Sequence, residues 1–258
     1  MSFSARRVRR AASAATVLLV AALLAAALAL APALAAAQIA PDAGTPGQAA
    51  YDLRQLVAKY VAWRGPAFDE LQTVHERLYV DTQAGRRSGA LWMDRQGRLR
   101  REIDGDDARL LEVAGPDGAW RLGADGRLED DPAGVERARR YAALQFGDAL
   151  RGRDGARAAL AGTADLEDRT WTVIRVSFGD ADVYDALVDP ATGGLCCYRI
   201  TEGGAQRTEL FGDWRLVDGV RMPFTRLVRA GYDMGFRAAA VELNRDLDPA
   251  LFAKPAEK

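Results

Sequence analysis

Few side chains in this 258-residue chain could perform nucleophilic or metal chemistry. There is one histidine, His75, and the only two cysteines, Cys196 and Cys197, are adjacent. A Ser-His-Asp or Cys-His mechanism would have to run through His75, and no serine lies in a nucleophile-elbow context. One histidine without a spaced cysteine pair also argues against zinc. We therefore interpret His75 as structural and predict no catalytic residue, no metal site and no cofactor.

The remaining polar chemistry is explained by turns and packing. Carboxylates are abundant and could form a glycosidase pair, so a hydrolase stays open as an alternative. Many of them, however, lie in turn positions, where they cap backbone amides: Asp104, Asp106, Asp117, Asp125, Asp189 and Asp218. A ring closed between Cys196 and Cys197 would be strained, so we predict two free, semi-buried thiols that point to opposite faces of a strand.

Charge and glycine usage exclude nucleic acid and nucleotides as partners. Lys and Arg number 35 against 36 Asp and Glu, and four of the arginines belong to the leader described next, which leaves 31 against 36, or a net charge of −5. An acidic chain with interspersed charges lacks the electrostatic footprint for nucleic acid. The 25 glycines mark turns, and no Gly-x-Gly-x-x-Gly precedes a helix.

The amino end has the pattern of an export signal. Four arginines, Arg6, Arg7, Arg9 and Arg10, precede the apolar run Ala11 to Ala31, and small residues follow Pro32. We predict a cleavable signal peptide over 1–37, with cleavage after Ala35 or Ala37, and hence a periplasmic protein. The apolar run is also long enough to remain as an anchor. A linker over 38–50 and a single domain over 51–258 follow.

The domain is predicted to be α+β and mainly β. Apolar residues at helical spacing from Leu53 to Val61 predict an amphipathic helix that ends near Gly65. Period-two segments separated by Asp-Gly turns then predict strands that pair as repeated hairpins. The expected strands are Leu71–Asp81, Gly89–Arg95, Arg98–Asp104, Arg109–Ala114, Gly118–Leu122, Trp171–Phe178, Val183–Asp189, Leu195–Glu202, Gln206–Trp214, Val220–Arg229 and Gly235–Leu243.

A sheet of that size should curl into an unclosed β-barrel, with helices covering its concave face. Asp131-Pro132 opens the second helix, which carries an apolar stripe to about Arg151. The stretch Gly152 to Leu166 is interpreted as a short helical turn plus loop.

Large apolar residues alternate on the strands and suggest a ligand cavity. Period two puts Leu210 with Trp214, and Met222 with Phe224, on one face. If that face is concave, a slot between sheet and helices would suit acyl chains, because burial of apolar surface is non-directional. The alternative is that the same residues form an ordinary dry core. The candidate cavity residues are Trp92, Trp171, Val173, Trp214, Met222 and Phe224.

Two late segments resemble the LolA/LolB-like superfamily of periplasmic lipoprotein carriers. The first runs from Phe211 to Phe224, FGDWRLVDGVRMPF, and the second from Val241 to Phe252, VELNRDLDPALF. The Asp189–Gly193 turn, DPATG, also resembles a turn found between earlier strands of such proteins. The resemblance covers about 40 residues in motif, and the order of elements agrees over most of the chain.

The resemblance implies an unclosed β-barrel whose helices enclose an apolar cavity for acyl chains. The expected function is therefore a non-catalytic periplasmic binding or carrier protein for a lipid, acyl chain or lipoprotein, with membrane-bound donor or acceptor proteins as further partners. No residue matches the cargo-latching arginine of the family. The alternative is an envelope regulatory protein of the stress-sensor kind, which uses the same fold to bind a protein partner.

Overall fold

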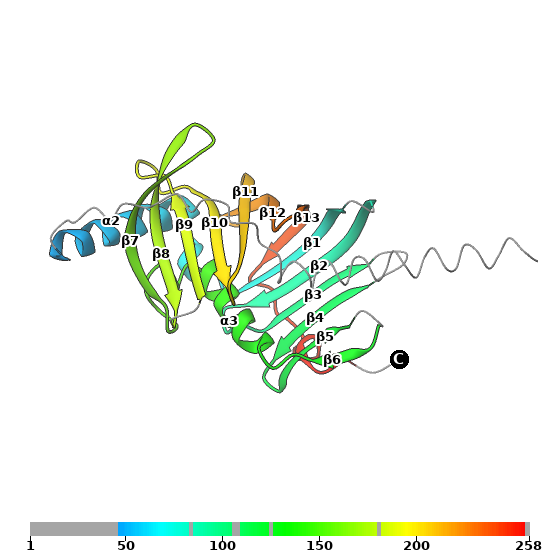
Figure 1. Ribbon diagram of the computed structural model, residues 1–258. Coiled ribbons are helices and arrows are strands. Elements are labelled where there is room, and N and C mark those ends of the chain that lie inside the picture. The colour runs from blue at the N-terminus through cyan, green and yellow to red at the C-terminus, as the bar shows by residue number, and fades with distance from the viewer. Residues whose placement is uncertain (1–45, 83–84, 105–108, 124–125, 180–181, 256–258) are drawn as a thin grey trace, which may run out of the picture.

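The fold is built around one antiparallel sheet (Figure 1). The computed structural model describes residues 46–82, 85–104, 109–123, 126–179 and 182–255. Thirteen strands lie in the order β6-β5-β4-β3-β2-β1-β13-β12-β11-β10-β9-β8-β7. They are β1 (Thr73–Thr82), β2 (Gly85–Asp94), β3 (Leu99–Asp104), β4 (Leu110–Gly115), β5 (Gly118–Leu122), β6 (Leu128–Asp130), β7 (Arg157–Leu166), β8 (Arg169–Phe178), β9 (Asp182–Val188), β10 (Leu195–Glu202), β11 (Ala205–Val217), β12 (Val220–Arg229) and β13 (Asp233–Leu243).

The sheet is not closed, because its two outermost strands are β6 and β7. These strands are consecutive in the chain, and helix α3 (Gly134–Gln145) connects them. The connection that contains the helix therefore crosses the concave side from one edge of the sheet to the other (Figure 1). The helix itself contacts β4 and β5, the strands next to β6. This arrangement confirms the predicted fold class, a mainly β, unclosed barrel with helices on its concave face.

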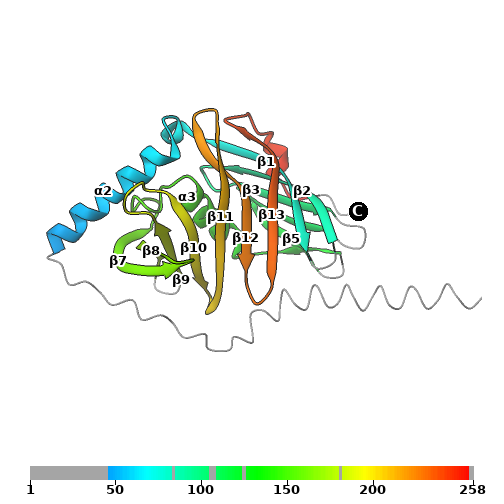
Figure 2. The same cartoon turned by 90° about the horizontal axis from the view of Figure 1, so that it is seen from above.

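Helix α2 (Pro46–Arg64) covers the other end of the sheet. It lies beside β7 and contacts β7 and β12 (Figure 2). Its buried residues Leu56, Val57 and Tyr60 recur at helical spacing and face the sheet, as the apolar periodicity predicts. The helix begins at Pro46, inside the expected 38–50 linker, and gives way at Gly65, whose φ is +118°. Two short 3-10 helices, η1 (Phe68–Glu70) and η2 (Pro249–Phe252), complete the elements.

The main core lies between these helices and the concave face. Its largest fully buried side chains include Tyr60, Phe68, Phe146 and Tyr198. Tyr60 and Phe68 meet edge to face, with ring centroids 5.8 Å apart. We call this set the aromatic core. It fills the space beneath α2 with side chains from α2, η1, β10 and the turn after α3.

The interpretation of Gly152 to Leu166 as a helical turn plus loop is wrong. Residues Arg157–Leu166 form strand β7, which pairs with β8 and has a register shift between Leu160 and Thr163. Four alanines favour a helix locally, but pairing with β8 and packing of Ala158 and Leu160 on the core override that propensity. Helix α3 also ends at Gln145, short of the expected Arg151, because Gly147 adopts a φ of +74°.

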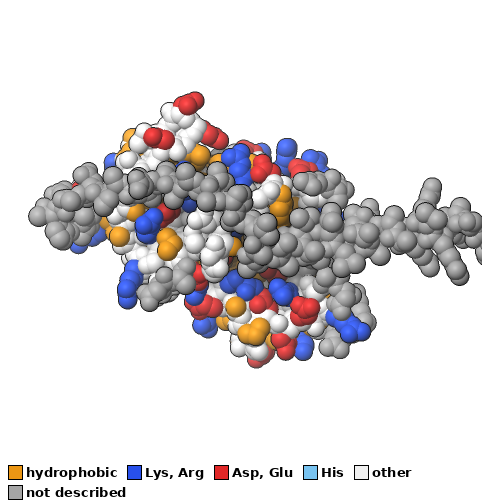
Figure 3. Space-filling view, viewed as in Figure 1, with side chains coloured by type: hydrophobic (Ala, Val, Ile, Leu, Met, Phe, Trp, Pro, Cys, Tyr) orange, Lys and Arg blue, Asp and Glu red, His pale blue; other side chains and the backbone are white. Residues whose placement is uncertain are grey.

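The predicted signal peptide, 1–37, lies outside the described residues, so its cleavage and the exported location stay predictions. Within the described ranges, no helix has the length and hydropathy needed to cross a membrane. On the face seen in Figure 3, acidic and basic side chains intersperse over the described surface, and hydrophobic ones occur between them as separate patches.

Candidate ligand cavity

The structure does not bring the six sequence-chosen residues together. Trp171 and Val173 lie on the face of the sheet away from the helices, in a small cluster with Leu187 and Cys197. Their strand neighbour Ile174 points the other way and belongs to the main core, as period two requires. Trp92 also lies outside the main core and stacks on His75, with ring centroids 5.1 Å apart.

The other three candidates pack near the C-terminal end of α2. Trp214 meets Trp63 edge to face at 4.6 Å, and Met222 is 3% exposed and accepts a hydrogen bond from Arg64 at 3.6 Å. Phe224 packs at the margin of the main core, under the guanidinium of Arg215.

The expectation that Leu210 and Trp214 share a face does not hold. Leu210 packs on the outer cluster, whereas Phe211 and Trp214 both pack on the main core. Asp213 lies between them with a φ of +48°, and this left-handed residue interrupts the alternation of β11. None of the six candidates therefore belongs to the lining of either hollow described below.

A cavity of about 420 Å³ lies between α3 and the concave face of the sheet. Helix α3 contributes Gly134, Ala138 and Tyr141 to its lining, at three- and four-residue spacing along one side of the helix. Opposite the helix, the apolar lining includes Leu78, Leu91, Leu99, Ile103, Val228, Met234 and Phe236. We call this hollow the concave cavity. Its volume falls in the range typical of small-molecule sites.

The arginines that line the concave cavity form ion pairs with carboxylates of the protein. Arg226 is 9% exposed, bonds Glu76 in a buried ion pair, and donates to the Tyr141 hydroxyl at 2.9 Å. Three further pairs line the cavity: Arg101 with Glu112 at 2.8 Å, Arg207 with Glu202 at 2.6 Å, and Arg137 with Asp131. Among the described residues, every buried side-chain nitrogen or oxygen has a hydrogen-bond partner. The buried polar atoms around the cavity thus have partners within the protein.

The pairing fixes the protonation states of these groups. Burial opposes the charge on Arg226, but Glu76, Tyr141 and Glu209 together outweigh it and raise the pKa of the guanidinium above its usual value. Burial alone would raise the pKa of Glu202, yet Arg207 and the Tyr184 hydroxyl together lower it. Burial raises the pKa of Tyr141. The pKa values of Arg101 and Arg137 are raised as well, so these two residues and Arg226 are cations at neutral pH, and Tyr141 is a neutral phenol.

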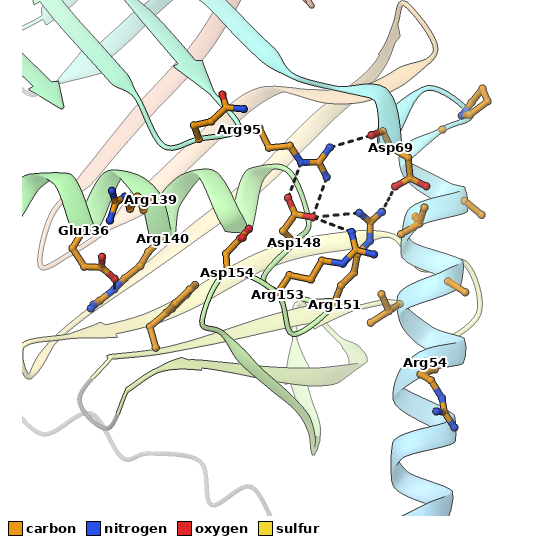
Figure 4. Close-up of a pocket in the computed structure, with 18 residues that line it drawn as sticks. Arg54, Asp69, Arg95, Glu136, Arg139, Arg140, Asp148, Arg151, Arg153 and Asp154 are labelled. Atoms are coloured by element: carbon orange, nitrogen blue, oxygen red, sulfur yellow. Dashed lines mark hydrogen bonds and ion pairs between the residues drawn. The ribbon is translucent and has the colours of Figure 1, made fainter. Parts of the chain in front are cut away.

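A second, larger hollow of about 1420 Å³ lies between α2 and α3 and is charged (Figure 4). Asp148 sits at its centre and bonds Arg95 at 2.8 Å, with Arg151 and Arg153 at 3.6 and 3.5 Å. Arg139 and Arg140 reach it from α3 and Arg54 from α2. Its apolar wall is limited to a few residues of α2 and Phe178, so it is an open polar groove less suited to an acyl chain.

The histidine lies on β1 and the two cysteines on β10. His75 lies 3.5 Å from Glu242 and stacks on the Trp92 ring. Both cysteines are free. They pack on the same outer cluster, contrary to the predicted opposite faces, because Cys196 is the extra residue of a β-bulge between Leu195 and Cys197. No group of three or more metal-ligating residues occurs in the described part of the chain.

Sequence reasoning missed the charged residues that line the cavity or pair with its lining, although the strands carry a signal for them. Glu76 lies between Val74 and Leu78 at period two, Arg101 lies between Leu99 and Ile103, and all six point to the concave side. A charged residue at an inward-facing position of an apolar alternation is costly without a partner. That cost indicates an internal ion-pair network, which the pattern of large apolar residues does not reveal.

Comparison with known proteins supports the fold. No family model matches the sequence, and no curated protein is significantly similar to it. Among solved structures, a LolA superfamily protein of Nitrosomonas europaea matches with a TM-score of 0.52 and 12% identity, over 78% of this chain and 97% of that one. A DUF1329 family protein of Desulfovibrio piger matches with a TM-score of 0.52 and 11% identity over the same shares. At this identity the likeness concerns the fold, and the chain has the fold of LolA superfamily proteins.

Proposed function

We propose that the protein is a non-catalytic carrier that binds the acyl chain of a lipid or lipoprotein in the concave cavity. The observation that supports this most strongly is the cavity itself, a partly open and mainly apolar hollow between α3 and the curled sheet. Each Å² of apolar surface that is buried contributes about 25 cal/mol of favourable free energy. Such a site would therefore bind hydrocarbon without directional contacts.

The leader over 1–37 supports a periplasmic location for this activity. A lipid that leaves one membrane must cross water, and a cavity that shields its chain lowers the cost of that transfer.

The test is mass spectrometry of organic extracts from protein purified without detergent. The informative variants are Ala138→Leu and Ala138→Phe, because Ala138 is 4% exposed on α3 and its side chain borders the cavity. We expect stoichiometric acyl species from the wild type, less from Ala138→Leu and least from Ala138→Phe. The control is Trp171→Phe, on the outer face, which should retain the wild-type amount.

Thermal unfolding of each variant separates loss of binding from loss of folding. A clean extract from the wild type, together with no uptake of added fluorescent fatty acid, would overturn the carrier proposal. An equal amount of lipid in folded Ala138→Phe and wild type would move the binding site out of the concave cavity.

A further inference from the structure

The volume of the concave cavity limits how many chains it can hold. A methylene group occupies about the same space as a water molecule in the liquid, roughly 30 Å³. The cavity of about 420 Å³ therefore accommodates on the order of 14 chain carbons. Two chains of 16 carbons would need about 960 Å³ on the same scale. One 16-carbon chain needs about 480 Å³ on this scale, close to the cavity volume of about 420 Å³, whereas two such chains need more than twice that volume.

The charges around the cavity limit which charge the head group of the ligand can carry. Each of its four guanidiniums already bonds a carboxylate of the protein. A fifth carboxylate, that of Glu209, is 8% exposed and borders the cavity. It lies close enough to Arg101 and Arg226 to act on both electrostatically. These groups sum to a net charge of −1, so an anionic head would meet neutralised arginines and one surplus negative charge.

Uncharged hydrogen-bonding groups also border the same space. The side chains of Gln145, Gln206 and Tyr232 contribute to the lining. Amides and phenols offer both donors and acceptors, which suit hydroxyl and ester groups without adding net charge. Because desolvation of a charged head is costly and the charged groups around the cavity sum to a surplus negative charge, a neutral head is favoured over an anionic one.

We infer that the ligand of the concave cavity is a single-chain amphiphile with an uncharged head, of the monoacylglycerol class. This inference rests on the proposed function and narrows its substrate class. It distinguishes the ligand from a free fatty acid, which has the same chain and a carboxylate head, and from lipids that would insert two or more chains.

The experiment measures displacement of a fluorescent acyl probe from delipidated protein at pH 7 by three competitors. These are 1-monohexadecanoylglycerol, hexadecanoate and dihexadecanoylglycerol. We expect monohexadecanoylglycerol to bind with one-to-one stoichiometry and at least tenfold more tightly than either of the others. Competition is compared below the critical micelle concentration of each amphiphile.

The variant Glu209→Gln tests the charge argument directly. Removing the surplus carboxylate should raise the affinity for hexadecanoate about tenfold and change that for monohexadecanoylglycerol less than threefold. The matched control is Glu242→Gln, the same chemical change beside His75 and outside the cavity lining, which should leave both affinities unchanged.

The outcomes separate the two levels of the proposal. Failure of the protein to bind the probe or any competitor contradicts the carrier function itself. Hexadecanoate binding as tightly as monohexadecanoylglycerol, or no gain for hexadecanoate in Glu209→Gln, overturns the neutral-head inference while the carrier function stands. Equally tight one-to-one binding of dihexadecanoylglycerol overturns the single-chain inference.

Discussion

Side chains pack on the concave face of the sheet differently beneath its two helices. Beneath α2, aromatic side chains fill the space, and Tyr60, Phe68 and Phe146 are at most 1% exposed. Beneath α3, the helix places Gly134 and Ala138 over the sheet, and a cavity of about 420 Å³ remains. The same curled sheet thus supports a dry core at one end and a hollow at the other. The size of the helix side chains decides which of the two forms.

The largest expected effect is loss of an aromatic side chain from the filled end. Phe68→Ala should lower the free energy of unfolding by about 4 kcal/mol, because a fully buried ring leaves an empty space in a packed core. Leu91→Ala, beside the cavity, should cost about 2 kcal/mol, because its surroundings already include free volume. Urea denaturation measures both. Equal costs would show that the two ends are packed alike.

The ion pair at the cavity wall should have the next largest effect. Glu76→Gln leaves the Arg226 guanidinium buried without its carboxylate, at a cost of about 3 kcal/mol. The double variant Glu76→Gln with Arg226→Met should recover most of that loss, since no charge then stays buried. A double variant no more stable than Glu76→Gln would show that the pair does more than neutralise a buried charge.

Low pH should lower the stability of the protein through Glu202, which lines the concave cavity. Its pKa is lowered in the folded protein from a value of 4.5, so its contribution to stability is full above pH 4.5. That contribution is lost as the pH falls through the lower, folded pKa. The melting temperature of the wild type should therefore drop more steeply below pH 4.5 than that of Glu202→Gln. Parallel curves for the two proteins would contradict the role of the Arg207 and Tyr184 contacts.

The smallest effect is expected on the outer face. Trp92→Ala removes a ring that stacks on His75 but belongs to neither the aromatic core nor the cavity lining. We expect a loss of about 1 kcal/mol and no change in acyl-probe affinity. Loss of binding in a folded Trp92→Ala protein would indicate that the binding site lies on the outer face of the sheet.

Local patterns predicted the strands well but not the direction of every side chain. Period two and Asp-Gly turns identify hairpins such as β11–β12, whose turn residues Asp218 and Gly219 have φ values of +45° and +80°. The alternation of β11 fails at Asp213, because a single left-handed residue changes the face of all that follow it. An alanine-rich strand such as β7 resembles a helix until its pairing partner is known.

The position of the cavity could not be read from single residues. It depends on which small residue of α3 lies over which part of the sheet, and helix docking sets that over a long sequence distance. The inward-facing charges Glu76, Arg101 and Arg226 were visible in the strands as exceptions to the apolar pattern. Their pairing across β1, β3, β4 and β12 required the sheet order.

Native mass spectrometry of the delipidated protein, titrated with 1-monohexadecanoylglycerol, tests most directly whether the hollow beneath α3 is the binding site. The account predicts one adduct per wild-type chain, the same single adduct in Trp171→Phe, and little or none in folded Ala138→Phe. An adduct retained in full by Ala138→Phe, or several adducts per wild-type chain, would contradict it.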